Sequence, residues 1–432
     1  MDERSKLLYI LYNFLLCFGF VFYLPFLLPK LLRGQGPEIG EKFGFLPQSL
    51  RTKTNGQTVI WIHGVSVGET VAAGPICRAI RDQFPQAKIV FSTVTDTGQK
   101  MAQKLIDADA FFYFPFDLSL VVKKVLNELN PKLVVIMETE LWPNLIRLAN
   151  QRGSKVVLAN GRISAKSYRG YKLFGPLLQQ MLRGIDLFLM QSQPDAEYIQ
   201  SLGADKERVF NCGNTKYDLN IDLAGEHCNN RLAKEMQVET NAPLLVVGST
   251  HANEEELLIP IYKRLKAEYQ DLVMILAPRH PERVKEVETL YQKAGIPTIR
   301  RTELQNARRE ASVIFLDTIG ELLPTYSLAD LVFVGGSLVK FGGHNILEPA
   351  AYGRTIFVGP YMDDFKDILS LFLNNDACIQ VKDHNELEEK MLYYLKNKHE
   401  ADEKGRSALR IVHLNQGATK RMVSLITGLW KE

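Results

Sequence analysis

QTVIWIHGVSVGET, at positions 57–70, carries more information about the architecture than any other segment of this chain. Its first half contains an unbroken apolar run of the kind found in strands that are buried on both faces. Small residues follow, and a helical, amphipathic pattern then runs from Glu69 to Phe84. A buried strand, a tight turn and a helix in this order form the repeating unit of a parallel sheet. The segment therefore predicts an α/β protein.

The same alternation continues through the rest of the chain. In the first half, further runs predicted as strands are Lys88–Thr93, Leu133–Met137, Lys155–Asn160 and Leu187–Ser192. After a polar, irregular stretch at residues 219–242, strands are again predicted, at Leu244–Gly248, Leu272–Ala277, Ser312–Leu316, Leu331–Val334 and Thr355–Val358. Two such series predict two doubly wound parallel-sheet domains that face each other across a cleft, with ligands at the carboxyl ends of the strands.

The composition excludes several classes of protein. A chain of 432 residues is long enough for two domains, and a net charge of +3 is too small to indicate nucleic-acid binding. The cysteines are odd in number and lack a C-x-x-C spacing, which argues against a disulfide framework and a zinc site. This pattern favours a reducing compartment. The five cysteines are Cys17, Cys77, Cys212, Cys228 and Cys378.

The N-terminus predicts a membrane-attached helix. Residues 7–29 form a run of 23 residues without a charge, long enough for a helix to cross roughly 30 Å of hydrocarbon. Glycine and prolines inside the run weaken the helix, so a segment that lies partly in the membrane interface is an alternative to a span. Basic residues after the run slightly outnumber those before it, which favours a cytoplasmic body. They are Lys30, Arg33 and Lys42 after it, and Arg4 and Lys6 before it.

Acidic residues follow two of the predicted strands in the first half. Glu69 opens a helix, where a carboxylate commonly does no more than stabilise the helix dipole, so a structural and a catalytic role are both open. Glu138 and Glu140 follow the strand at 133–137 and precede Pro143, which suits the first position of a helix. One of these two carboxylates can cap that helix rather than take part in chemistry.

The second half offers loops suited to a nucleotide. Arg279 and His280 follow the strand at 272–277, and an arginine can bind a phosphate through two hydrogen bonds, although a solvated turn is an equal alternative. The glycines of Gly335–Ser337 and of Gly342–Gly343, the latter ahead of a helix, are expected to form a backbone-amide cradle for an anion. Walker A, G-x-G-x-x-G, H-E-x-x-H and G-x-S-x-G patterns do not occur, which disfavours ATP and NAD enzymes, zincins and α/β-hydrolases.

Several of these loops together resemble one family over nearly the whole chain. The shared motifs are SVGET (66–70), FPFD (114–117), METELWPN (137–144), NGRIS (160–164), GNTKYD (213–218), PRHPER (278–283), FVGGSLV (333–339) and GGHNILEP (342–349). They are similar to the bacterial transferases of 3-deoxy-D-manno-octulosonic acid (Kdo). The resemblance implies a GT-B glycosyltransferase fold, a CMP-Kdo donor, a lipid A precursor (lipid IVA) as acceptor, and a place on the cytoplasmic side of the bacterial inner membrane.

With this resemblance, each part of the chain has an expected role. The expected parts are a membrane anchor (1–33), an acceptor-binding domain (34–222), a linker (223–242), a CMP-sugar-binding domain (243–405) and a C-terminal helix (406–432). By motif position, the resemblance implies Glu69 as the catalytic base and Glu138 and Lys216 as groups that support the transition state. The residues that it implies for CMP binding are Arg279, His280, Ile319, Gly320, Glu321, Asn345, Ile346, Leu347 and Glu348.

The resemblance also implies a single displacement with inversion, and we expect no cofactor, divalent metal or nucleic acid. Two departures from the family pattern, Asn214-Thr215 before Lys216 and NGR where NAR is more usual, are expected not to touch a catalytic group. Two other functions share parts of the pattern. A sugar-nucleotide epimerase needs the phosphate loops but no membrane segment, and a membrane-bound sugar-nucleotide binding protein does not need Glu69 and Glu138 together.

Overall fold

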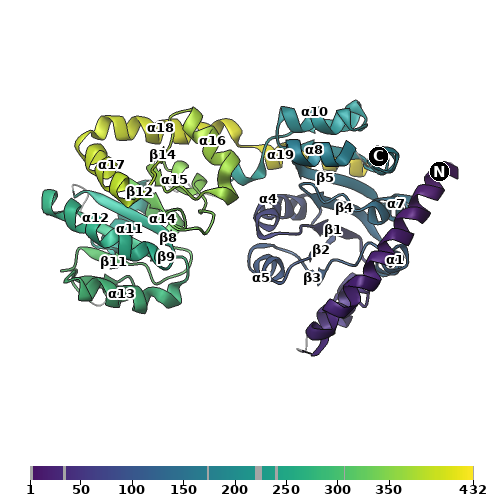
Figure 1. The fold of residues 1–432 in the computed structure, drawn as a ribbon, viewed down its shortest axis with the longest axis horizontal. Helices are drawn as coiled ribbons and strands as arrows, with labels where there is room; N and C mark the ends of the chain where they lie inside the picture. The colour runs from purple at the N-terminus through teal and green to yellow at the C-terminus, as the bar shows by residue number, and fades with distance from the viewer. Residues whose placement is uncertain are drawn as a thin grey trace. The chain divides into compact units, whose positions relative to one another are not determined.

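The computed structural model describes residues 3–32, 36–172, 175–218, 226–238, 242–305 and 307–431. The chain divides into two compact units (Figure 1). The first unit is Met1–Asp218 with Asn415–Glu432, and the second unit is Leu219–Leu414. Each unit contains a seven-stranded sheet in which every strand pairing is parallel. The two parallel-sheet α/β units that the sequence predicts are therefore present.

The sheet of the first unit has the order β3-β2-β1-β4-β5-β6-β7. Its strands are β1 (Val59–His63), β2 (Lys88–Thr93), β3 (Ala110–Tyr113), β4 (Pro131–Met137), β5 (Lys155–Gly161), β6 (Leu187–Met190) and β7 (Val209–Asn211). The helices that follow β1 to β6 are α4 (Val67–Gln83), α5 (Asp96–Leu105), α6 (Ser119–Leu129), α7 (Pro143–Gln151), α8 (Ala165–Lys172), α9 (Gly175–Leu182) and α10 (Gln193–Ser201). Because the order changes direction at β1, loops after β1 and β4 lie at the position where ligands usually bind.

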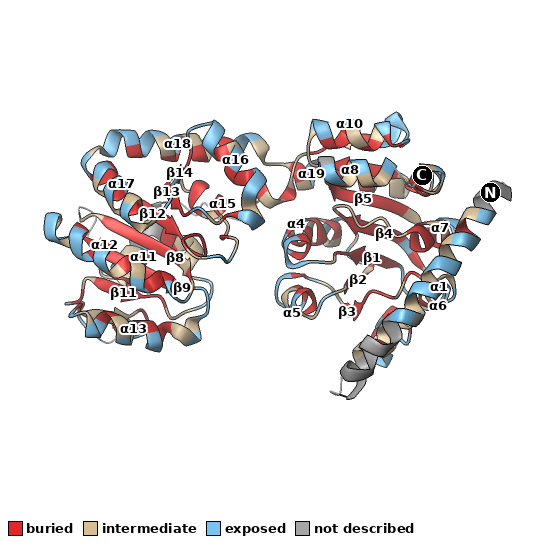
Figure 2. Cartoon of the chain, in the orientation of Figure 1, coloured by how far each residue is buried: buried red, intermediate tan, exposed pale blue. Residues whose placement is uncertain are grey.

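Helices cover both faces of this sheet, which explains why its central strands are apolar without alternation. All five residues of β1 are buried. Trp61 packs into the core that includes residues of α6 and α7, whereas Ile60 and Ile62 pack into the core that includes residues of α4 and α19 (Ala418–Lys431). Figure 2 shows the central strands of both units mostly in the colour of buried residues.

The sheet of the second unit has the order β10-β11-β9-β8-β12-β13-β14. Its strands are β8 (Leu244–Thr250), β9 (Val273–Pro278), β10 (Thr298–Arg300), β11 (Val313–Phe315), β12 (Leu331–Val334), β13 (Thr355–Val358) and β14 (Ile379–Gln380). Its helices are α11 (Glu226–Glu235), α12 (Glu254–Glu268), α13 (Val284–Lys293), α14 (Leu322–Tyr326), α15 (Leu347–Ala350), α16 (Lys366–Asn374), α17 (His384–Lys396) and α18 (Lys398–Asn415). Short 3₁₀ turns occur in both units. The first unit contains η1 (Lys206–Arg208) and η2 (Thr215–Tyr217), and the second contains η3 (Pro281–Arg283), η4 (Glu303–Gln305) and η5 (Asp363–Phe365).

Two segments differ from the sequence-based expectation. Helix α11 occupies part of the stretch predicted as a linker, and Glu235 at its end pairs with Arg301 at 2.8 Å. Residues 219–225 and 239–241 of that stretch lie outside the described residues. The helix predicted over 406–432 is in fact divided into α18 and α19, because Gly417 between them takes a φ of +85°. The Asp218 carboxylate then accepts the Gly417 and Thr419 N–H groups at the start of α19.

The N-terminal run forms a single helix, α1 (Glu3–Leu32), which belongs to the first unit. It contacts α9 and α2 (Gly36–Lys42), and α3 (Gln48–Thr54) follows before the sheet begins. Figure 2 shows much of its described surface as exposed. Within the part of the chain that the structure describes, none of the helices combines the length and the apolar character that crossing a membrane requires.

Candidate functional site

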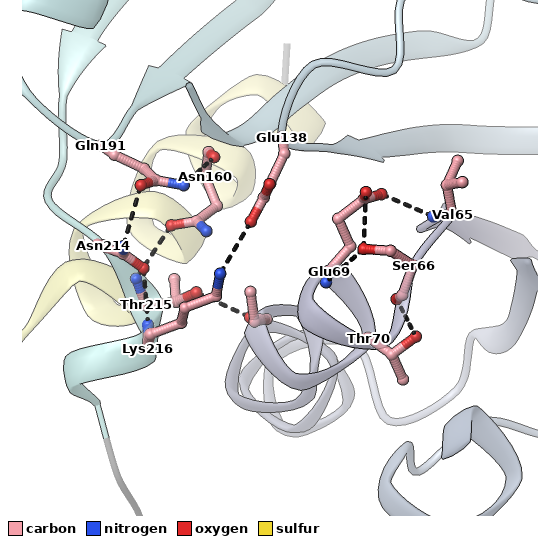
Figure 3. Close-up of polar contacts among 11 residues, drawn as sticks. Val65, Ser66, Glu69, Thr70, Glu138, Asn160, Gln191, Asn214, Thr215 and Lys216 are labelled. Carbon is pink, nitrogen blue, oxygen red and sulfur yellow. Dashed lines mark hydrogen bonds and ion pairs between the residues drawn. The ribbon is translucent and has the colours of Figure 1, made fainter. Parts of the chain in front are cut away.

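The loops after β1, β4, β5, β6 and β7 place polar side chains at one edge of the first sheet. These strands are consecutive in the sheet and parallel, so their carboxyl ends meet at the same edge. Figure 3 shows the hydrogen bonds and ion pairs among the residues of these loops. Glu69 comes from α4, Glu138 from the end of β4, and Lys216 from η2 after β7. All three lie in the first unit.

The first turn of α4 holds the Glu69 side chain in place. Ser66 is the N-cap residue of α4, and its hydroxyl accepts the Glu69 N–H at 3.3 Å. The Glu69 carboxylate in turn accepts the Val65 N–H at 2.6 Å and the Ser66 hydroxyl at 3.0 Å. This reciprocal arrangement resembles a capping box, except that the carboxylate accepts the N–H of Val65, one residue before the N-cap, and it satisfies backbone donors at the helix start. The structural and the catalytic roles that the sequence leaves open for Glu69 are therefore compatible.

The surroundings of Glu69 also change its acidity. The residue is only 7% exposed. Burial, together with the negative charges of Glu138 and Glu140, raises the pKa of its carboxyl to about 7, although the hydrogen bonds from Val65 and Ser66 lower it. A carboxylate with a pKa near 7 can accept a proton at neutral pH and is suited to the role of a general base.

Glu138 and Lys216 form an ion pair at this edge. Lys216 Nζ lies 3.3 Å from Glu138 Oε1, and both side chains are largely buried. Glu138 has a φ of +53°, a conformation that is strained for a residue with a side chain. A Cβ built on Gly68, in the first turn of α4, would lie 3.8 Å from Lys216 Nζ. The ammonium group is thus close to the start of the helix that bears Glu69.

Glu140 is the less well-defined carboxylate of the METELWPN motif. It is partly buried, and burial followed by the charge of Glu138 raises its pKa. The Tyr171 hydroxyl donates to the carbonyl of the neighbouring Thr139 at 3.2 Å. The ion pair with Lys216 therefore distinguishes Glu138 from Glu140, a choice that the sequence alone does not make.

A set of amides positions Lys216, and sequence reasoning missed them. The Asn214 side chain accepts the Lys216 N–H at 2.9 Å, and the Asn160 side chain accepts the Thr215 N–H at 3.0 Å. Gln191 joins the two asparagines by accepting from Asn214 and donating to the Asn160 carbonyl, both at 2.9 Å. The expectation that Asn214 does not touch a proposed catalytic group is therefore wrong.

In the second unit, Arg279 and His280 follow β9, as the sequence predicts. Both are exposed, and the Arg279 N–H donates to the Thr250 carbonyl at the end of the neighbouring strand β8. His251, directly after β8, lies 2.9 Å from His344 between their Nε2 atoms, and Phe341 stacks on it at 4.0 Å. Burial, followed by neighbouring positive charge, lowers the pKa of both imidazoles to about 4. The sequence analysis did not single out His251.

Asn345 to Glu348 form the start of α15. The Asn345 amide accepts the Leu347 N–H at 3.1 Å and donates to Glu348 at 3.2 Å. Burial raises the pKa of Glu348, while the hydrogen bond from Asn345 and the positive charge of Arg279 lower it. Ile346 and Leu347 are completely buried.

The turn Ile319–Gly320–Glu321 follows β11, next to β9 in the sheet. Ile319 is 90% exposed and Gly320 has a φ of +91°, which favours glycine. Glu321 is held by Arg301, at 3.0 Å, and by the Thr318 hydroxyl. The predicted CMP-binding residues thus follow three strands, β9, β11 and β12. Helix α14 begins directly after Glu321, α15 contains Leu347 and Glu348, and these two helices contact each other.

The amides after β12 do form a cradle, but they bind a carboxylate of the protein itself. Gly336, Ser337 and Leu338 donate to Glu254 at distances of 2.8 to 3.1 Å. Glu254 is fully buried, and burial raises its pKa to about 7 against these hydrogen bonds. The expectation that the Gly335–Ser337 loop binds a ligand anion is therefore wrong. Glu254 lies 82 residues before Gly336 in the chain, so no local pattern reveals the contact.

The described residues contain no group of three or more histidines, cysteines or acidic residues that is arranged to hold a metal ion.

Comparison with known proteins relates both units to one family. The family model described as 3-deoxy-D-manno-octulosonic-acid transferase (kdotransferase) matches residues 37–219. The 3-deoxy-D-manno-octulosonic acid transferase of Haemophilus influenzae is 33% identical over 90% of this chain and 90% of its own. The enzyme of the same name from Chlamydophila psittaci is 32% identical over 87% of this chain and 86% of its own.

A solved structure adds information on the fold alone. UDP-GlcNAc 2-epimerase from Neisseria meningitidis, bound to UDP-GlcNAc, matches with a TM-score of 0.54 at 12% identity, over 86% of this chain and 99% of that one. The two-domain architecture is thus found in proteins of different activity, and the sequence relatives carry the assignment. Given their identity and coverage, this chain belongs to the family of 3-deoxy-D-manno-octulosonic acid transferases, which are glycosyltransferases.

Proposed function

We propose that this protein is an inverting glycosyltransferase that moves Kdo from CMP-Kdo to a lipid A precursor, lipid IVA, in lipopolysaccharide biosynthesis. Membership of the Kdo transferase family supports the reaction. The observation that carries the catalytic part is the buried Glu69 carboxyl, whose pKa is raised to about 7 beside the Glu138–Lys216 pair. A base of this acidity is what an acceptor hydroxyl requires.

In the proposed step, Glu69 takes the proton of a hydroxyl group on the acceptor. The hydroxyl oxygen forms a bond to the anomeric carbon of Kdo, and the bond from that carbon to the phosphate oxygen of CMP breaks. CMP leaves as a phosphate monoester with a second pKa of about 6, so its departure needs no general acid. Lys216, oriented by Glu138, stabilises the negative charge that develops during this displacement.

The second unit is the proposed donor site. Arg279 and His280 after β9 offer a cation and an imidazole. Ile319–Glu321 follows the adjacent strand β11, and Asn345–Glu348 follows β12, which β8 separates from β9. The positive charge of Arg279 lowers the pKa of Glu348, which supports a single site that includes both segments. Because the proposed base lies in the first unit and the nucleotide residues in the second, binding and chemistry can be impaired separately.

Product analysis tests this function. Purified protein is incubated with CMP-Kdo and a tetra-acylated lipid A precursor, and the lipid is examined by mass spectrometry. We expect the acceptor to gain the mass of at least one Kdo residue, with CMP released only when the acceptor is present. An isomerised sugar formed from donor alone would indicate an epimerase instead. Bound donor without turnover would indicate a binding protein.

We also propose that α1 attaches the protein to the cytoplasmic face of the bacterial inner membrane. Large apolar side chains lie along one face of α1 at helical spacing and are 53–67% exposed, which is unusual for a surface that meets only water. They are Leu7, Ile10, Leu11, Phe14, Leu15, Phe18 and Phe22, and together they are called the apolar stripe below. The described cysteines are all free, which supports a reducing compartment.

Substitutions in the apolar stripe test the attachment. Changing Leu11, Phe14 and Phe18 together to Ser should move the protein from the membrane fraction to the soluble fraction, because each buried apolar side chain contributes about 1.5–3 kcal/mol. CMP binding by the second unit should be unchanged. Leu414→Ser, at a residue that is 77% exposed on α18, is the matched control and should stay membrane-bound. If the triple variant still sediments with membranes after a high-salt wash, α1 is not the attachment.

A further inference from the structure

The face of α1 opposite the apolar stripe is joined to the first unit by a polar network. Tyr12 donates its hydroxyl to Asp117 at 3.0 Å. Asn13 and Asn144 exchange hydrogen bonds through their amides at 3.0 and 3.3 Å. Attachment to a membrane does not require such contacts, and pairing polar groups at an interface fixes one register of the helix. We call Tyr12, Asn13, Asp117, Ser119 and Asn144 the docking network.

The docking network supplies caps that two helices lack. The N-cap residues of α6 and α7, Leu118 and Trp142, make no side-chain capping bond. The Asn13 side chain accepts the Ser119 N–H at the start of α6, at 3.1 Å. Asp117 accepts the N–H groups of the second and third residues of α7, Asn144 and Leu145, at 2.9 Å each. Asn13 of α1 therefore caps α6 directly, whereas α7 is capped by Asp117, the residue to which Tyr12 of α1 donates its hydroxyl.

Helix α7 follows directly after the loop that carries Glu138 and Glu140. Trp142, its N-cap, packs on Phe114 at 4.9 Å and on His63 at 6.4 Å between ring centroids. His63 ends β1 and precedes the loop to Glu69. The start of α7 is thus the fixed end of the Glu138 loop and, through Trp142, also touches the strand that leads to Glu69.

We propose that Tyr12 and Asn13 are positioning residues for the Glu138 loop, so that α1 is a structural part of the catalytic unit as well as its membrane attachment. The inference rests on the proposed function, because it assumes that Glu138 and Lys216 act in Kdo transfer. A catalytic group must be held within about 0.5 Å by the residues around it. A shift of about 1 Å can reduce the rate about 100-fold. Loss of the Asn13 amide removes the cap of α6 and one partner of the buried Asn144.

The experiment measures transfer in detergent with saturating lipid acceptor, so that recruitment to a membrane does not limit the rate. Asn13→Ala should lower kcat by about 10- to 100-fold. Tyr12→Phe, which removes one hydroxyl group, should lower it by about 3- to 10-fold. Both variants should keep the parental KM for CMP-Kdo and the parental Kd for CMP, because the donor residues lie in the second unit. This split between kcat and KM distinguishes positioning from general damage.

A matched control is Asn127→Ala. Asn127 accepts a hydrogen bond from Arg152 at 2.6 Å and joins α6 to the opposite end of α7, so its loss should leave kcat unchanged. The inference is overturned if Asn13→Ala and Tyr12→Phe transfer Kdo at the parental kcat. It is also overturned if kcat and CMP affinity fall together. If Asn13→Ala does not fold, Tyr12→Phe decides. Failure of the parent protein to transfer Kdo would instead refute the proposed function.

Discussion

Glu69→Gln is expected to lose Kdo transfer by about 10²–10⁴-fold while it binds CMP as the parent protein does. Gln keeps the size of the side chain and can still accept one hydrogen bond from Val65 or Ser66, but it cannot take a proton. A positioned general base contributes a factor of this size, which corresponds to about 3–5.5 kcal/mol of activation free energy. Initial rates of transfer and calorimetric titration with CMP measure the two effects separately.

The converse variant is the control for this experiment. Arg279→Ala should weaken CMP binding by about 1.5–3 kcal/mol, the range for a hydrogen bond to a charged group. If Glu69 only caps α4, the Glu69→Gln variant would transfer Kdo at nearly the parental rate. Its free energy of unfolding would be lower by about 0.3–1 kcal/mol. That outcome would leave Glu138 or Glu140 as the candidate base. An unchanged CMP affinity in Arg279→Ala would place the nucleotide on another loop.

Lys216→Met is expected to lower kcat by about 10²–10³-fold, the effect of removing one group that stabilises developing charge. Met preserves most of the length of the side chain but removes the ammonium group that lies 3.3 Å from Glu138. The Glu138 carboxylate is then left largely buried without its cation, so the variant should also have a lower free energy of unfolding. Steady-state kinetics and thermal denaturation report the two consequences.

A double substitution separates stability from catalysis at this ion pair. Adding Glu138→Gln to Lys216→Met removes the unpaired buried charge and should recover part of the lost stability. It should not recover transfer, because the ammonium group is still absent. If the double variant regained the parental rate, Lys216 would serve only to neutralise Glu138.

The strands that the sequence predicts and those that it misses differ in position. All four missed strands, β3, β7, β10 and β14, are at the edges of the two sheets. They contain only two to four residues, and several of their residues are partly exposed. A central strand needs a continuous apolar run because helices cover both of its faces, whereas a short edge strand has no such requirement. The central strands of each sheet can therefore be predicted from their apolar runs, whereas the edge strands cannot.

The candidate site shows the same division between local and distant information. Glu138 directly follows the buried strand β4, and Glu69 lies in the first turn of the helix after β1, so the strand pattern predicts both positions while leaving their roles open. Lys216 was identified only through a family resemblance, since its ion pair joins residues 78 positions apart. Glu254 shows how a local pattern can suggest a ligand site that the fold has already filled. It fills an amide cradle that the glycine pattern alone suggests is available to a ligand.

Helix α1 itself can be predicted from the local sequence, whereas its polar contacts with the rest of the first unit cannot. Its uncharged run predicts the helix, and the exposed apolar stripe is the basis of the proposed membrane attachment. A single asparagine within such a run carries no recognisable signal in the sequence. Only the fold brings Asn13 to the starts of α6 and α7, because its partners lie more than 100 positions away.

The pH dependence of kcat/KM for transfer, measured between pH 5 and 9, examines the role of Glu69 in the free enzyme. Glu69 acts as a base only when it is deprotonated, and its pKa is raised to about 7. The account predicts that kcat/KM rises about tenfold for each pH unit below 7 and becomes constant above about pH 8, whereas the residual rate of Glu69→Gln does not follow this curve. A parental profile that is flat across pH 7, or the same curve in Glu69→Gln, would contradict it.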